Sequence, residues 1–174
     1  ISFYNTMKAN AIHPIIGYEA FLTFGNRFEK SASIKQGERP YYNLVLLAKD
    51  LEGYFNLVHL ASKAFTEGLH YKPRIDIEIL AEHSKGLIAL SGGIKGVIWH
   101  YLEQKNFAEA ENKVKFFENL FGTENYFLEI QEHSLPNEKT IQRSLIELSK
   151  KTNIRLVGTN EPHYLTPEDA RAHE

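Results

Sequence analysis

Residues 44–48 read Leu-Val-Leu-Leu-Ala and are followed at once by Lys49 and Asp50. A short apolar run bounded by polar residues is typical of a strand that is buried on both faces. Asp50 stands where a helix N-cap is expected, and a helical pattern continues to about Gly68. The apolar face of this helix is predicted to consist of Leu51, Tyr54, Phe55, Val58 and Leu60. A buried strand that leads directly into a helix predicts a β/α unit.

The same alternation of strands and helices extends to both sides of this unit. Further strands are predicted at residues 14–22, 86–91, 126–131 and 154–160, and further helices at residues 2–10, 75–83, 96–104, 107–121 and 136–151. Residues 25–42 are polar and predict a long loop that can include a hairpin. Strands separated by helices indicate parallel β/α units, in a barrel or in an open doubly wound sheet. Because an eight-stranded barrel needs about 250 residues, these strands are too few to close one.

The composition is that of a globular domain with nearly balanced charge. Lys and Arg number 20 against 22 Asp and Glu, which gives a formal net charge of -2. A domain that bound DNA by itself would carry a basic excess, because phosphate neutralisation supplies most of the non-specific affinity. The chain has no cysteine, which excludes a disulfide framework, a thiolate zinc site and a cysteine nucleophile.

The length suits one domain, and no linker or internal repeat divides residues 1–174. No apolar run approaches the roughly 20 residues that span a bilayer, so we expect no membrane contact and a cytoplasmic location. The chain opens on Ile1 without an initiator Met, and residues 167–174 have the pattern of the first turns of a helix. We therefore expect an internal fragment of a longer protein.

Candidate catalytic groups are expected at the carboxyl ends of the strands, where the active sites of parallel β/α folds lie. Glu19 belongs to the first strand, Glu132 and His133 end the fourth, and Glu161 and His163 follow the last. Carboxylate and imidazole groups that converge at one edge could hold a hard or borderline divalent metal. Such a metal could activate water against a phosphate ester.

Each of these residues also has a purely structural interpretation. Glu19 can form a salt bridge or accept a hydrogen bond from a helix cap, His163 can bind a loop, and His133 can lie on the surface. The sequence contains no Gly-rich phosphate loop, no nucleophile elbow and no run of alternating basic and aromatic residues. Tyr41 and Tyr42 are expected to pack within the fold rather than to stack on bases.

Several motifs recur in a fixed order along almost the whole chain. They lie in residues 3–20, 43–57 (beginning Asn-Leu-Val-Leu-Leu-Ala-Lys), 86–92 (Gly-Leu-Ile-Ala-Leu-Ser-Gly), 127–133 (Phe-Leu-Glu-Ile-Gln-Glu-His) and 159–170 (beginning Thr-Asn-Glu-Pro-His-Tyr-Leu). Any one of them is weak evidence, but together they are specific. This set resembles the PHP (polymerase and histidinol phosphatase) domain of bacterial DNA polymerase III alpha subunits, the C-family replicative polymerases.

The resemblance implies an α/β fold, namely a partial, distorted β/α barrel of the PHP type. The family's barrel has seven strands, and the N-terminal strands are expected to be missing here. In some members the domain holds a metal cluster and supports phosphoester hydrolysis, including exonucleolytic proofreading. It also serves as a scaffold beside the polymerase and in some members contacts the proofreading partner. The polymerase carboxylates lie further along the family's chain.

The resemblance carries over only part of the family's metal ligands. Glu19 and His163 match ligands, and Glu161 stands where the family has Asp. Asn43 replaces a His and Gly93 replaces a Cys. The two N-terminal motifs rich in His and Asp are absent from the sequence. The metal site, for Zn or Mn, is therefore reduced to Glu19, His163 and Glu161, with Mg expected in the parent polymerase, and no catalytic residue is assigned.

Three hypotheses remain open from the sequence. The first is a scaffold domain of a replicative DNA polymerase with a degenerate metal site, and the second is a metal-dependent phosphoesterase or 3′–5′ exonuclease with altered ligands. The third is an unrelated β/α binding protein. Under the first two, the partners are the rest of the polymerase chain, replisome subunits and DNA bound through the parent enzyme.

Overall fold

The computed structural model describes residues 2–30 and 37–173, and its strands form one sheet in the order β3-β4-β1-β2-β5-β6-β7. The strands are β1 (Gly17–Thr23), β2 (Tyr42–Ala48), β3 (Leu69–His70), β4 (Lys72–Asp76), β5 (Leu87–Leu90), β6 (Tyr126–Ile130) and β7 (Leu156–Gly158). β2 runs antiparallel to both of its neighbours, β1 and β5. β1 is parallel to β4, and β5, β6 and β7 are parallel to one another. The expected α/β sheet is confirmed, but with two strands reversed, because the short strand β3 also runs antiparallel to its neighbour β4.

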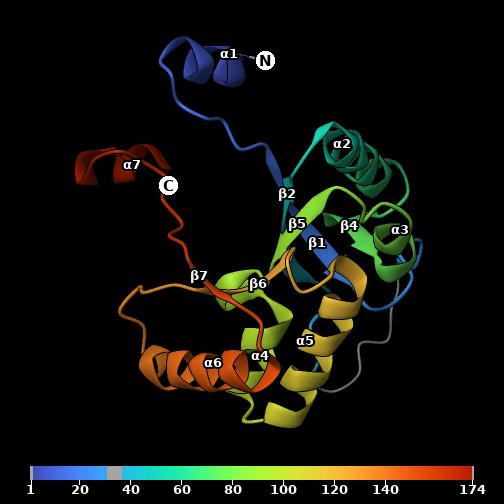
Figure 1. Ribbon diagram of the computed structural model, residues 1–174, viewed down its shortest axis with the longest axis vertical. Coiled ribbons are helices and arrows are strands. Elements are labelled where there is room, and N and C mark those ends of the chain that lie inside the picture. Colours follow the sequence, from blue (N-terminus) through green and yellow to red (C-terminus); the bar gives the residue numbers. More distant parts are fainter. Residues whose placement is uncertain (1, 31–36, 174) are drawn as a thin grey trace.

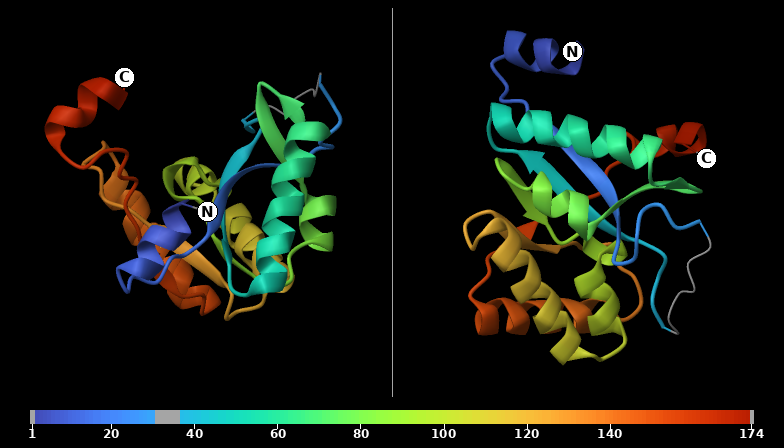
Figure 2. Two further views of the ribbon diagram at one scale, coloured as in Figure 1. Left: turned by 90° about the horizontal axis from the view of Figure 1, so that it is seen from above. Right: turned by 90° about the vertical axis from the view of Figure 1, so that its right-hand side faces the viewer.

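The helices of the described residues are α1 (Ser2–Ala9), α2 (Leu51–Thr66), α3 (Ile77–Glu82), α4 (Val97–Glu103), α5 (Phe107–Phe121), α6 (Glu138–Thr152) and α7 (Ala170–His173), with the 3-10 turns η1 (Gly93–Lys95) and η2 (Pro167–Asp169). Figures 1 and 2 show α2 and α3 beside one end of the sheet and α4, α5 and α6 beside the other, with α1 and α7 apart from both groups. None of these helices combines the length and the apolar character that crossing a membrane requires.

The register of the sheet shows that its helices cover one face, as in a barrel. Leu46 pairs with Ala89, and Ala89 pairs with Tyr126, so these side chains share a face. Phe117 of α5 stacks on Tyr126 there, with the two ring centroids 5.3 Å apart. α2 packs on β1, β2 and β4, and its buried residue Leu60 belongs to the same continuous core. A doubly wound sheet would carry helices on both faces, so the structure favours the open, partial barrel.

Two of the expectations drawn from the sequence are wrong. Residues 72–76 form the strand β4 between β3 and β1, so residues 75 and 76 belong to a strand and the expected helix begins only at Ile77. The inward face of α2 consists of Gly53, Leu57, Leu60 and Ala64, whereas Leu51, Phe55 and Val58 are exposed. The remaining strands and helices lie close to the predicted ranges. The hairpin considered within residues 25–42 falls largely on 31–36, which lie outside the described residues.

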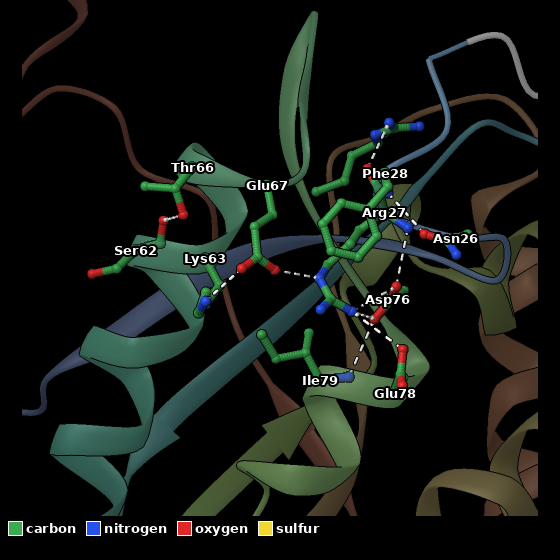
Figure 3. Close-up of polar contacts among 11 residues, drawn as sticks. Asn26, Arg27, Phe28, Ser62, Lys63, Thr66, Glu67, Asp76, Glu78 and Ile79 are labelled. Atoms are coloured by element: carbon green, nitrogen blue, oxygen red, sulfur yellow. Dashed lines mark hydrogen bonds and ion pairs between the residues drawn. The ribbon is translucent and has the colours of Figure 1, made fainter.

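A network of charged side chains fixes the loop that follows β1 (Figure 3). Nη1 of Arg27 lies 3.0 Å from Oδ1 of Asp76, and its Nε lies 2.8 Å from Oε2 of Glu67. Asp76 also accepts hydrogen bonds from the backbone N–H groups of Arg27 and Ile79, the second of which caps α3. The loop after β1 is thereby tied to the end of α2 and the start of α3.

Candidate functional site

The sheet brings the candidate residues to one edge through cross-strand pairing. Glu19 of β1 pairs with Val45 of β2, and Val45 pairs with Leu90 at the end of β5. These three side chains point to the face that the helices leave uncovered. Phe127 pairs with Leu90, so Glu129, two residues further along β6, continues the same face. The uncovered face thus brings Glu19, from the first half of β1, level with the carboxyl ends of β5 and β6, where Glu129 lies.

A cavity of about 240 Å³ opens at this edge, and we call it the carboxylate cavity. Three carboxylates line it, together with one ammonium group, two amides, a hydroxyl and several apolar or glycine positions: Glu19, Glu129, Glu161, Lys95, Gln131, Asn160, Thr159, Val45, Leu90, Gly92 and Ile94. The sequence predicted Glu19 and Glu161 at this edge, and the structure brings both to the same cavity. It adds Lys95 and Glu129, which the sequence left without a role.

Lys95, from the turn η1, is the cation of the carboxylate cavity. Its Nζ lies 2.8 Å from Oε1 of Glu161. This hydrogen bond raises the pKa of Lys95 above its ordinary value, and the charges of Glu161 and Glu19 act in the same direction. The same hydrogen bond lowers the pKa of Glu161. Both groups are therefore charged at neutral pH. The Lys95 ammonium occupies a carboxylate oxygen that a metal ion would need as a ligand.

Glu19 is held by Asn43 of β2, at the position where the sequence resemblance led us to expect a His. Nδ2 of the buried Asn43 donates a hydrogen bond of 2.7 Å to Oε1 of Glu19. The amide therefore presents its NH₂ group, a donor without a lone pair for a metal, toward the carboxylate. An Asn in this orientation positions Glu19 but cannot join it in binding a cation.

Glu129 is a buried carboxylate whose oxygens are occupied by donors from three directions. Its Oε2 accepts from the backbone N–H of Gly92 at 3.0 Å. Its Oε1 accepts from Oγ1 of Thr159 at 2.5 Å and from Nε2 of Gln131 at 3.3 Å. Three hydrogen bonds compensate for the loss of water around a buried charge. Glu129 thus ties the ends of β5, β6 and β7 together.

Gly93 and Gln131 meet at the position where the sequence resemblance led us to expect a Cys. Gly93 has a φ of +52°, and a Cβ added to it would lie 2.3 Å from Oε1 and 2.7 Å from Cδ of Gln131. The side chain of Gln131 therefore fills the space that a residue larger than glycine would need. Its Oε1 is buried without a hydrogen-bond partner among the described residues.

The two candidate histidines lie in different surroundings. Nε2 of His163 lies 3.6 Å from Oε1 of Glu161, so His163 is at the edge of the carboxylate cavity. The backbone N–H of His133 instead donates to the carboxylate of Glu138, 2.9 Å from Oε2. Burial acts to raise the pKa of Glu138, but N–H donors from His133 and Leu135 outweigh it and lower that pKa. Nδ1 of His133 lies 3.3 Å from Oε1 of Glu138, so His133 packs against the start of α6 rather than on the surface.

These donors do not fit a multinuclear metal centre. Across residues 2–30 and 37–173, no three His, Cys, Asp or Glu side chains are grouped closely enough to hold an ion. Oε1 of Glu161 is bound to the Lys95 ammonium, and Oε1 of Glu19 to the Asn43 amide. The Lys95 ammonium would repel a divalent cation that entered the carboxylate cavity, and the cation would have to displace it from Glu161.

Some of these residues carried signals that the sequence alone did not resolve. Glu129 and Gln131 lie in a recognised motif, but only the end of the strand beyond them was considered. Lys95 lies two residues beyond the Gly92–Gly93 turn that follows β5. A cation in the turn after a strand end, at the edge where two carboxylates are predicted, is the signal that identifies it.

Comparison with known proteins agrees with this arrangement. The sequence profile of the PHP domain matches residues 1–133. The chain is 41% identical over 174 residues to the DNA polymerase III subunit alpha of Aquifex aeolicus, covering 98% of this chain and 15% of that protein. It is 44% identical to that of Thermus aquaticus over 174 residues and 43% identical to that of Deinococcus radiodurans over 176 residues. Each of these two alignments covers 100% of this chain, and 14% and 13% of the respective relative.

The family profile covers most of the chain, from α1 to the end of β6, and includes Glu19 and Lys95. The relatives are similar over its whole length, including the segment with Glu161 and His163, although this chain spans only 13 to 15% of their length. Both findings agree with a partial barrel of the PHP type. The chain belongs to the PHP domain family.

Proposed function

We propose that this chain is the PHP domain region of a bacterial replicative DNA polymerase and acts there as a scaffold with a degenerate metal site. The similarity to DNA polymerase III alpha subunits over the full chain supports the first part. The observation that carries the second part is the 2.8 Å contact between Nζ of Lys95 and Oε1 of Glu161. The Lys95 ammonium neutralises the carboxylates at this edge, as a bound metal ion would otherwise do.

In this proposal Glu19, Glu161 and His163 are the remainder of a site for Zn or Mn. Glu19 and Glu161 face the same cavity, and His163 lies beside Glu161. The missing positions are Asn43, which donates rather than accepts, and Gly93, which has no side chain. These residues then stabilise the edge of the sheet and take no part in chemistry.

We further propose that residues 1–174 form a single domain. Beyond the segment that the family profile matches, α6 and β7 continue the same sheet and the same core. Ile141, Leu145 and Leu148 of α6 are buried in the hydrophobic cluster that also contains Leu46 and Leu60. A shared core of this kind is what distinguishes one domain from two.

A scaffold needs a surface for its partner, and α2 supplies one. Leu51, Phe55, Val58 and Phe65 recur at helical spacing along its outer side, and their exposed fractions range from 47 to 70%. Exposed apolar stripes of this kind mark interaction sites. Since the relatives are about seven times longer than this chain, we assign the stripe to the rest of the polymerase chain. The same proposal implies three further properties. The partners include replisome subunits and DNA held by the parent enzyme, the polymerase site binds Mg, and the protein is cytoplasmic.

A second candidate function is metal-dependent phosphoester hydrolysis, including 3′–5′ exonuclease activity, with an altered ligand set. One observation favours it, namely the buried Oε1 of Gln131, which has no hydrogen-bond partner among the described residues and lines the carboxylate cavity. Such an atom can mark the place of an unseen ligand.

Elemental analysis of the full-length gene product, purified without chelator, distinguishes these two functions. The scaffold proposal expects less than stoichiometric zinc and manganese, both in the wild type and in a Glu19→Ala, His163→Ala double variant. Stoichiometric metal that the double variant loses would instead support the hydrolase. A primer-extension assay with Mg²⁺ tests the polymerase assignment separately, and failure to extend a primed template would contradict it.

A further inference from the structure

Two histidine rings meet at the end of the sheet where α2 and α3 lie (Figure 1). His59 comes from the middle of α2, and His83 is the C-cap residue of α3. Their ring centroids are 4.1 Å apart, and the ring planes are inclined by 32°. His59 is exposed and His83 is half-buried, so solvent reaches the pair. Two separate elements thus contribute one imidazole each to an accessible pair outside the carboxylate cavity.

Asn56 of α2 sets the tautomer of His83. Nδ2 of Asn56 donates a hydrogen bond of 2.8 Å to the backbone carbonyl of Lys85, so its Oδ1 faces Nδ1 of His83, 3.2 Å away. Because an amide oxygen only accepts, Nδ1 of His83 carries the proton of the neutral ring and Nε2 holds the lone pair. Histidines that bind metals are held in this way, with one ring nitrogen donating to an oxygen and the other left for the metal.

The charges around the two rings are compatible with a bound cation. Partial burial, followed by the charge of His59, lowers the pKa of His83, so its ring is neutral at pH 7. The ammonium of Lys85 is paired with Glu52, with Nζ 3.0 Å from Oε1. The charge of Glu82 acts on His83 in the opposite direction to that of His59, so a negative charge lies near the pair. A cation at the two rings therefore meets an offset ammonium and a nearby carboxylate.

We propose that His59 and His83 together bind a divalent transition metal of the imidazole-preferring class, with Zn²⁺ as its representative. Neutral imidazole suits zinc, copper and nickel, whereas Mg²⁺ prefers carboxylate, carbonyl and water oxygens. Two protein ligands leave the remaining coordination positions to water. The metal links α2 to the end of α3. This site goes beyond the scaffold function and uses none of the residues of the carboxylate cavity.

The test labels the histidines of the full-length gene product with diethyl pyrocarbonate, with and without Zn²⁺. The reagent acylates a neutral imidazole nitrogen, and mass spectrometry of the digested protein follows each histidine separately. Zn²⁺ is expected to protect His59 and His83 over the same range of zinc concentration, and Mg²⁺ is expected to protect neither. His13 and His70 lie on other segments and serve as internal controls, whose labelling should not change.

Variants distinguish one shared metal from two independent contacts. In His59→Asn, Zn²⁺ should no longer protect His83, and in His83→Asn it should no longer protect His59. Asn56→Leu should raise the zinc concentration for half protection about tenfold, because it removes the acceptor that orients His83. Asn56→Asp keeps an acceptor for Nδ1 and should retain the protection. His70→Asn is the matched control for loss of an imidazole and should change neither signal.

Three outcomes would overturn the proposal: protection of one ring that persists in the variant without the other, equal protection by Mg²⁺, or equal protection of His13 and His70. Failure of either ring of the pair to react in the absence of metal would show that the rest of the parent protein covers it, and would also exclude the site. Zn²⁺ bound in the carboxylate cavity would instead protect His163, so the scaffold function is tested by a different signal in the same experiment.

Discussion

Nζ of Lys95 lies 2.8 Å from Oε1 of Glu161, which joins two residues 66 positions apart across the edge of the sheet. The contact lowers the pKa of Glu161 and raises that of Lys95, so each group keeps the other charged. Under the scaffold proposal, this ammonium supplies the positive charge that a metal would otherwise bring to the two carboxylates.

Replacing this ammonium should restore affinity for a metal. Lys95→Met removes the positive charge and leaves Glu19 and Glu161 facing the same cavity, so Mn²⁺ is expected to bind at least about tenfold more tightly, corresponding to about 1.4 kcal/mol. Isothermal titration with Mn²⁺ measures the change, and Lys85→Met serves as the control for loss of a surface charge. Equal affinity in wild type and Lys95→Met would show that the ammonium does not exclude the metal.

Glycine is required at position 93 because of its conformation and because of Gln131. Gly93→Ala should lower the free energy of unfolding by about 2 kcal/mol, from the strain of a positive φ and from overlap with the Gln131 side chain. In the Gly93→Ala, Gln131→Ala double variant, the loss of unfolding free energy from steric overlap should disappear, while the loss from the positive φ should remain. Urea denaturation of the two single variants and the double variant measures this coupling. Strictly additive losses would mean that the two side chains do not compete for space.

The Arg27–Asp76 pair should be important for stability because Asp76 is almost fully buried. Asp76→Ala removes the cap of α3 and leaves the Arg27 guanidinium without a main partner, so a loss of about 3 kcal/mol is expected. Glu78 also contacts Arg27, but its side chain is 73% exposed. Glu78→Ala should therefore cost less than about 0.5 kcal/mol by the same denaturation measurement. Similar losses for both variants would contradict the importance of burial.

Two histidines on neighbouring helices should make stability depend on pH. The rings of His59 and His83 lie 4.1 Å apart, and partial burial, followed by the charge of His59, lowers the pKa of His83 below its ordinary 6.5. A His with a lowered pKa in the folded state takes up its proton more readily when unfolded. Stability is therefore full above the unfolded pKa of 6.5 and decreases as the pH falls toward the folded pKa.

His59→Asn should remove the repulsive charge and shift the NMR titration midpoint of His83 upward. The neighbouring Glu82 already acts in that direction. The expected loss of stability on acidification should become smaller in this variant. An unchanged midpoint would mean that burial alone lowers the pKa of His83.

Helix α2 allows a direct comparison of an exposed and a buried apolar side chain. Leu60 is fully buried, so Leu60→Ala should cost about 3 kcal/mol of unfolding free energy. Phe55 is 62% exposed, so Phe55→Ser should change that free energy by less than about 0.5 kcal/mol. In the full-length protein, however, Phe55→Ser should loosen the contact with the rest of the chain, which faster proteolysis between the two parts would reveal. A large loss from Phe55→Ser in the isolated fold would contradict its exposure.

Local patterns were sufficient wherever a residue acts on its immediate neighbours. Asp50 was predicted to cap a helix, and its Oδ1 accepts from the backbone N–H of Gly53 at 2.8 Å. The apolar runs around Leu46, Ala89 and Leu128 predicted central strands, because a strand that is buried on both faces of a sheet is apolar on both. The strand β4 was missed because residues 72–76 read Lys-Pro-Arg-Ile-Asp, and only pairing with β1 makes them a strand.

The orientation of α2 was also beyond the local pattern. A Cβ added to Gly53 would lie 1.8 Å from the carbonyl oxygen of Gly86, so this side of the helix approaches the backbone before β5. The small residue thereby turns Leu57 and Leu60 inward and leaves Phe55 outside. The apolar pattern alone predicts that Phe55 faces the core. The close approach of the two backbones requires instead that Gly53 face it.

The sequence by itself determined the order of the strands and helices other than β3 and β4, the family, and the presence of Glu19 and Glu161 among the candidate ligands. Each of these depends on neighbouring residues or on a motif that is continuous in the chain. Only the tertiary structure decided that Lys95 binds Glu161, that Asn43 turns its amide toward Glu19, and that the rings of His59 and His83 meet. Charges interact through space and not along the chain, so residues from distant segments acquire their roles only when the sheet brings them together.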